Sequence, residues 1–153
     1  IEDKDRIVTG WGASLSGIWQ FAQNTSLCFQ GVYGKGISNY IQDISGTGLD
    51  LVPNATAEGK LKAFGAWGGY IGFSHNWSKV LTSNIMYSYA RVLDRYGMPT
   101  TSYKYAQYAA ANLFWDFSEY GSCAIEYVFG RRNDFNKDYG NASRINTMIQ
   151  YRF

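Results

Sequence analysis

The last ten residues of the chain read Arg144-Ile145-Asn146-Thr147-Met148-Ile149-Gln150-Tyr151-Arg152-Phe153 and alternate strictly in polarity. Successive side chains of a β-strand point to opposite faces, so one face here would be apolar and the other polar. The apolar face would hold Ile145, Thr147, Ile149, Tyr151 and Phe153. This pattern is typical of a strand in a transmembrane β-barrel, although the edge strand of a soluble β-sandwich also alternates.

The composition favours the barrel. Aromatic residues make up 18% of the 153 residues, and 17 residues are glycine. Charged residues make up only 17%, against roughly a quarter in typical soluble domains. No stretch approaches the ~18 consecutive apolar residues of a transmembrane helix, so a membrane location would require strands. The formal net charge of +2 and the absence of a basic run argue against a nucleic-acid partner.

Polar and glycine-containing segments separate about seven alternating runs. These expected strands are 7–19, 26–36, 60–74, 79–92, 104–117, 122–131 and 144–153. Tilted strands need ~9–11 residues to cross a bilayer, and most of the runs are at least that long. Bacterial single-chain barrels have an even number of strands. We therefore expect either an unrecognised strand near the N-terminus or, for the whole of 1–153, the C-terminal portion of a single larger barrel domain.

The connections between the runs differ in length. Short turns follow the first, third and fifth runs, whereas longer segments follow the others, at 37–59, 93–103 and 132–143. Outer-membrane barrels have short periplasmic turns and longer extracellular loops, so the last strand would end at the periplasm. Aromatic residues gather near the short turns, as in an interfacial girdle. They are Trp19, Phe21, Phe73, Trp77, Trp115, Phe117 and Tyr151.

Several short motifs follow one another in a characteristic order. They are Tyr33-Gly34-Lys35-Gly36-Ile37, Gln107-Tyr108, Asn112-Leu113, Glu126-Tyr127, Gly130-Arg131-Arg132-Asn133 and Ala142-Ser143-Arg144-Ile145. In this order they resemble the C-terminal half of DcaP-like porins of Gram-negative bacteria. The resemblance implies an antiparallel up-and-down barrel of about sixteen strands, a homotrimer and passage of small anionic solutes such as dicarboxylates. That family tends to have a basic residue near the position of Asn39, where this chain departs from it.

The resemblance and the alternation together predict a passive channel for small hydrophilic solutes, surrounded by outer-membrane lipid and lipopolysaccharide. A final strand that ends in Phe also resembles the signal that the barrel assembly machinery recognises, formed here by Ile149, Tyr151 and Phe153. The expected pore-lining residues are Lys62, Asn84, Tyr108, Asn112, Asp116, Glu126, Arg144, Asn146, Gln150 and Arg152. The expected outer-mouth residues are Asn39, Tyr40, Gln42, Asp43, Arg131 and Arg132, with the two arginines attracting anions.

The segment 37–59 could fold inward as a constriction, because irregular backbone at membrane depth is tolerated where it lines water. Two other functions stay open. A small closed barrel, filled by side chains, would be a non-channel adhesin or structural protein. A soluble β-sandwich could bind carbohydrate on exposed aromatic residues, and it would purify without detergent.

Catalytic or metal chemistry finds little support. The single histidine, His75, falls in an expected short turn, and any Ser-His or Cys-His nucleophilic pair would have to use it. We expect it to be a turn or interface residue. The stretch 134–140 departs from a calcium-binding loop in the position of its glycine and in having Ile145 where a glutamate is needed. We therefore expect no metal, no cofactor and no enzyme. An ion pair of Glu126 with Arg144 or Lys62 is expected rather than a carboxylate pair with Asp116.

The two cysteines fall in separate expected strands. Alternation places Cys28 on the inner face and Cys123 on the outer face. A disulfide requires Cβ atoms about 4 Å apart, so both are expected as free thiols.

Overall fold

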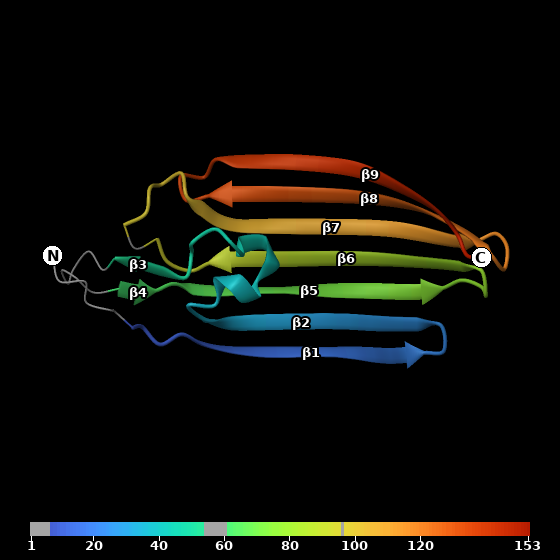
Figure 1. The fold of residues 1–153 in the computed structure, drawn as a ribbon, viewed down its shortest axis with the longest axis horizontal. Coiled ribbons are helices and arrows are strands. Elements are labelled where there is room, and N and C mark those ends of the chain that lie inside the picture. The colour runs from blue at the N-terminus through green and yellow to red at the C-terminus, as the bar shows by residue number, and fades with distance from the viewer. Residues whose placement is uncertain (1–6, 54–60, 96) are drawn as a thin grey trace.

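The computed structural model describes residues 7–53, 61–95 and 97–153, and these are dominated by one antiparallel sheet (Figure 1). Its seven strands lie in the order β1-β2-β5-β6-β7-β8-β9, so each pairs with the next sheet strand along the chain. They are β1 (Trp11–Ala22), β2 (Thr25–Lys35), β5 (Gly65–Asn76), β6 (Leu81–Val92), β7 (Tyr103–Asp116), β8 (Gly121–Asp134) and β9 (Tyr139–Tyr151). The predicted all-β, up-and-down architecture is confirmed.

The connection between β2 and β5 contains four short elements. The 3₁₀-helices η1 (Ser38–Tyr40) and η2 (Gln42–Ile44) come first, and β3 (Leu51–Pro53) then pairs with β4 (Leu61–Ala63). Within the described residues, no helix has the length and apolar character needed to cross a membrane.

Three expected boundaries are wrong. The first strand, expected over 7–19, runs instead from Trp11 to Ala22. The strand expected over 60–74 is divided, because β4 pairs with β3 while β5 begins separately at Gly65; residue 60 lies outside the described residues. The loop expected over 132–143 is instead a hairpin, in which Asn133 pairs with Tyr139. The connection after β8 is therefore as short as the one after β7, and the contrast of short and long connections holds only for the first two pairs.

The register of the sheet sorts its side chains onto two faces. One face, here called the polar face, carries the row Asn84, Asn112, Glu126 and Asn146 across β6, β7, β8 and β9. The opposite face, here called the apolar face, carries the neighbouring row Ile85, Ala111, Tyr127 and Ile145. Cys28 lies on the polar face and Cys123 on the apolar face, and both are free thiols, as predicted.

The apolar face is exposed over its whole width in the described structure. Ile125 in β8 is 53% exposed and Ile149 near the end of β9 is 83% exposed, although both belong to paired strands. The residues expected to form an aromatic girdle are also exposed at the end of the sheet that carries the short turns, and Trp19 contacts Phe21 at 5.8 Å between ring centroids. A large exposed apolar surface is stable only against lipid or another apolar surface.

The two edges of the sheet also indicate a surrounding that this open sheet does not supply by itself. The strands β1 and β9 each have one neighbour among the described strands, so one side of each exposes unpaired backbone N–H and C=O groups. Lipid offers no hydrogen bonds to such groups, so a membrane-spanning sheet must close into a barrel. The open seven-stranded sheet therefore agrees with a part of a larger barrel.

A charge on the apolar face tests this assignment. We expect Ile125→Arg in the full-length protein to lower the free energy of unfolding in lipid vesicles by about 2–4 kcal/mol, the range for arginine near the midplane of a barrel. The control is Ala124→Arg, one residue away on the polar face. Urea titration followed by tryptophan fluorescence measures both, and equal effects of the two variants would contradict the assignment.

Candidate functional site

The segment between β2 and β5 folds back across the polar face, where Figure 1 shows η1 and η2 in front of the strands. Its apolar side chains form the buried core of the molecule with residues near the ends of β5, β6 and β7. Ile44, Phe64 and Val92 are almost completely buried. The core members are Ile37, Ile41, Ile44, Leu49, Phe64, Ala66, Ala90, Val92 and Tyr103. Apolar burial therefore holds the segment against the sheet.

Two glycines allow this close approach. A Cβ atom added to Gly68 would lie 3.0 Å from Cγ2 of Ile41, and one added to Gly12 would lie 3.0 Å from Cγ2 of Ile37. Such distances are shorter than ordinary van der Waals contact, so a larger residue at either position would displace the isoleucine above it. Strand glycines commonly mark a close approach of another part of the chain.

The carboxylate of Asp50 fixes the start of η1. The backbone N–H of Ser38 donates to Oδ1 at 2.7 Å, and the side-chain amide of Asn39 donates to Oδ2 at 2.9 Å. The backbone of Asp50 also accepts a hydrogen bond from the N–H of Phe64 at 3.0 Å. Hydrogen bonds to charged groups are each worth about 1.5–3 kcal/mol, so Asp50 contributes much of the polar attachment of the segment.

A groove of about 540 Å³ lies between η1–η2 and the polar face. Tyr40, Gln42 and Asp43 line it from the segment. From the sheet it is lined chiefly by Gln30, Val32, Gly68, Tyr70, Met86, Ser88 and Tyr108. We call it the η groove. Three of the predicted mouth residues thus share one cavity, whereas Asn39 is engaged by Asp50.

Further along the polar face, four predicted pore-lining residues form a continuous hydrogen-bonded row. The side-chain amide of Asn84 donates to Asn112 at 2.8 Å, and Asn112 donates to Glu126 at 3.4 Å. Asn146 donates to the other carboxylate oxygen of Glu126 at 2.9 Å. The expected partner Arg144 lies opposite Val128 instead, so the predicted ion pair of Glu126 with Arg144 is wrong.

The other predicted pore-lining residues are placed as follows. Tyr108, Asp116, Arg144 and Gln150 lie on the polar face with the row just described, and Arg152 follows the end of β9. Asp116 lies opposite Ser122, four residues along β7 from the position opposite Glu126, so the two carboxylates are not adjacent. Lys62 lies in β4, outside the seven-stranded sheet.

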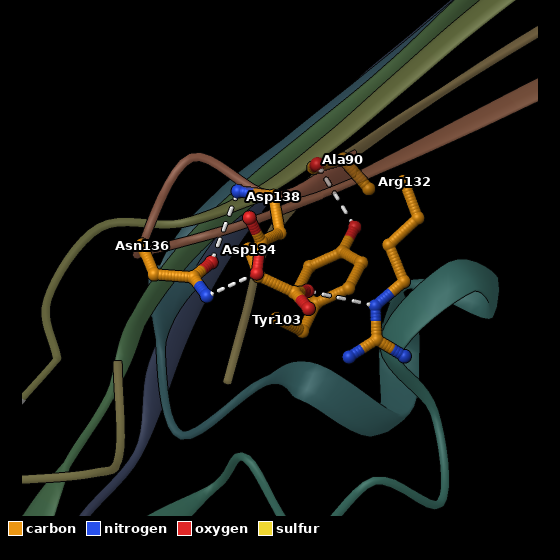
Figure 2. A network of polar contacts seen from close by, with 6 residues as sticks. All are labelled: Ala90, Tyr103, Arg132, Asp134, Asn136 and Asp138. Carbon is orange, nitrogen blue, oxygen red and sulfur yellow. Dashed lines mark hydrogen bonds and ion pairs between the residues drawn. The ribbon is translucent and has the colours of Figure 1, made fainter. Parts of the chain in front are cut away.

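The two mouth arginines lie on opposite faces. Arg132 lies on the polar side, where its Nε is 2.9 Å from Oδ1 of Asp134 and its guanidinium lies 5.7 Å from the ring centroid of Tyr103 (Figure 2). Arg131 lies on the apolar side, 4.1 Å from the ring centroid of Tyr139. The expectation that both arginines face the mouth is therefore wrong for Arg131, because successive strand residues alternate in direction.

The polar stretch after β8 forms a tight turn. The backbone N–H of Asp138 donates to the side chain of Asn136 at 3.0 Å, the Asn136 amide donates back to the Asp138 carboxylate, and Lys137 has a φ of 76° (Figure 2). The carboxylate of Asp138 therefore stabilises the turn, and that of Asp134 forms the ion pair with Arg132. Within the described residues, no three His, Cys, Asp or Glu side chains group as metal ligands.

His75 lies in β5, one residue before its end, rather than in the turn that was expected. Its Nδ1 is 2.8 Å from the hydroxyl of Thr25, and its ring contacts Trp77. These contacts join β2, β5 and the following turn, which is a structural role.

The sequence did not reveal that η1 and η2 are anchored in a core. One signal was present: Ile37, Ile41 and Ile44 are spaced by four and three residues, as in a helical segment with one apolar face. The 3₁₀ turns are short, and the surrounding Gly and Asp residues make the stretch resemble a loop. Asp50 gave no signal, because its two partners precede it by more than ten residues.

Comparisons with known proteins give one structural match and no match by sequence. No family model and no curated protein matches the chain. The crystal structure of the outer membrane channel DcaP of Acinetobacter baumannii superposes with a TM-score of 0.76 and 19% sequence identity, over 94% of this chain. The chain has the fold of part of that channel. It spans 41% of the length of DcaP, and the resemblance to the fold of such a channel is confirmed for the described seven-stranded sheet.

The glycine at the base of the η groove offers a test of the packing. We expect Gly68→Leu to detach η1 in the full-length protein, because its side chain would occupy the place of Ile41. Chymotrypsin cleavage after Tyr40 should then become faster. Gly31→Leu is the matched control, since nothing lies within 4 Å of a Cβ atom at that position. Unchanged protection in Gly68→Leu would refute the packing.

The attachment by Asp50 makes a second, independent prediction. Asp50→Ala removes both side-chain acceptors, and we expect the local opening of η1 to become easier by about 1.5–3 kcal/mol. Hydrogen exchange of the Ser38 amide, followed by mass spectrometry, measures this change. Asp50→Asn keeps one acceptor oxygen and should fall between the wild type and Asp50→Ala. Equal exchange in all three proteins would show that Asp50 does not hold η1.

Proposed function

We propose that the chain forms part of an outer-membrane porin that allows passive diffusion of small hydrophilic solutes. The single observation that supports this most is the segment 37–50, which is anchored on the polar face and narrows the space beside it. A porin lumen is polar and water-filled, and irregular backbone can lie at membrane depth only where it lines water or protein. The similarity to DcaP, a channel, points the same way.

We propose further that 1–153 is the C-terminal portion of one barrel domain, and that the polar face lines the lumen. Its lining would include the Asn84–Asn146 row, Tyr108, Asp116, Arg144, Gln150 and Arg152. The apolar face would contact outer-membrane lipid, and Arg131 at its rim would lie near the phosphate groups of lipopolysaccharide. A homotrimer is proposed from the motif resemblance alone.

The anion preference implied by the motifs gains no support from the η groove. Asp43 lies in its lining, and among the residues that the structure describes no Lys, Arg or His lines it. Arg132 is paired with Asp134 close to Tyr103, and Arg131 lies on the other face. Pore-lining charge sets ion selectivity, so this part of the lumen would not favour dicarboxylates. We therefore restrict the proposal to small hydrophilic solutes.

A second candidate, a closed barrel without a channel, is less well supported. Small closed barrels are filled by side chains from all their strands, whereas the polar face here leaves an open groove. A soluble β-sandwich would have to cover the apolar face, and no second layer covers it within the described residues.

Conductance distinguishes these functions. The full-length protein in planar bilayers should give stepwise ion currents, and Gly68→Leu should raise the single-channel conductance because η1 no longer narrows the lumen. Gly31→Leu again serves as the control. A closed barrel would insert without current, and a soluble β-sandwich would purify without detergent; either result would exclude the porin.

The C-terminal strand offers a test of assembly. We propose that Ile149, Tyr151 and Phe153 form the signal for the barrel assembly machinery. Deletion of Phe153, whose side chain is fully exposed, should lower the amount of heat-modifiable barrel in the outer membrane several-fold. The control is Arg152→Gln, on the other face of the same terminus. Normal assembly of the deletion variant would argue against the signal.

A further inference from the structure

A second polar row crosses the polar face beneath η1 and η2. Gln30 lies opposite Tyr70, Tyr70 opposite Ser88, and Ser88 opposite Tyr108, so four neighbouring strands each contribute one side chain. Adjacent strands are about 4.8 Å apart, which makes this row roughly 14 Å long. All four residues line the η groove. We call them the groove row.

The groove row differs from the row at Asn84–Asn146 in one decisive respect. In the Asn84–Asn146 row, the side-chain amides and the carboxylate of Glu126 form hydrogen bonds with one another. Within the described part of the chain, the side chains of the groove row have no hydrogen-bond partner. Their amide and hydroxyl groups, which both donate and accept, are therefore available to a solute.

The charge of the η groove limits what that solute can be. The carboxylate of Asp43 lies in the lining, and no cationic side chain of residues 7–53, 61–95 or 97–153 lines the groove with it. A dianion in the groove would lose hydration and meet a negative charge, and both effects disfavour it. A neutral solute with many hydroxyl groups avoids the repulsion, and its hydroxyls can donate to Asp43 and pair with Gln30, Gln42 and Ser88.

Aromatic rings supply the apolar contacts that such a solute needs. Tyr70 and Tyr108 lie on either side of Ser88 in the groove row, and Tyr40, which is 82% exposed, faces the groove from η1. Tyrosine combines an apolar ring with a polar tip, which suits a ligand that carries both C–H and O–H groups on its surface. The volume of about 540 Å³ lies within the usual range of small-molecule sites.

We propose that the η groove is a binding site for neutral polyhydroxylated solutes of the size of a mono- or disaccharide. This rests on the proposed function, because it places the site inside a pore. The rings of Tyr40, Tyr70 and Tyr108 hold the C–H surfaces of the solute, and Gln30, Gln42, Asp43 and Ser88 bond its hydroxyl groups. The carboxylate of Asp43 disfavours dianions at the same site.

Single-channel recording of the full-length protein tests the site, with maltose as the neutral probe and succinate as the dianion. Maltose should interrupt the ion current in a concentration-dependent way, and succinate should do so only at higher concentrations. We expect Tyr70→Ala and Tyr108→Ala each to raise the half-blocking concentration of maltose about tenfold, as loss of an aromatic contact does. Ile85→Ala, which shortens a side chain on the apolar face, is the control and should leave it unchanged.

The outcomes separate the two proposals. Each variant's open-channel current shows that its barrel has folded, so a changed block reports on the groove. Three results would each overturn the carbohydrate site alone. The first is a normal current that maltose does not interrupt, and the second is a block by succinate at lower concentrations than by maltose. The third is the wild-type block in Tyr70→Ala and Tyr108→Ala. The absence of any current would overturn the pore itself. Ser88→Lys adds a positive test, because a cation in the groove row should shift the preference toward succinate.

Discussion

In the membrane-spanning barrel that we propose, every strand of the sheet faces lipid on one side and water on the other, and the rest of the structure depends on this constraint. Lipid excludes unpaired backbone groups and charged side chains, whereas an aqueous lumen favours polar ones. The strict alternation of the final strand meets both demands, and the other strands repeat it. The same constraint explains why the buried core is small and lies to one side, since neither face of a barrel wall has to be covered by protein.

The segment between β2 and β5 adds a local core to this wall. Isoleucines of the segment contact glycines on two strands, and Asp50 binds the backbone at the start of η1. These contacts are made by residues that face the sheet or the segment's own interior. Tyr40, Gln42 and Asp43, by contrast, project into the η groove. One short stretch of chain therefore provides both an anchor and a lining.

Much of the sheet could be predicted from the sequence, because alternation is a local signal. It placed Cys28 and Cys123 on the correct faces and identified most of the polar face. It failed where polar residues stand on both sides of a strand, as at the β8–β9 hairpin, since polarity there no longer distinguishes strand from loop. It also failed for contacts across long sequence distances: the link from Ser38 to Asp50 and the packing of Ile41 on Gly68 depend on tertiary structure. Arg131 was misplaced for a simpler reason: it ended an expected strand whose odd-numbered residues are apolar, so its parity already placed it on the apolar face, but it was grouped with Arg132 by charge alone.

The separation of anchor and lining in the segment 37–50 has a consequence for how such a protein can diverge. Substitutions at Tyr40, Gln42 or Asp43 alter the chemistry of the passage without disturbing Ile37, Ile41, Ile44 or the glycines beneath them. Under the proposed function, the preference among solutes can thus change through a few exposed positions while the strands and their register stay constant.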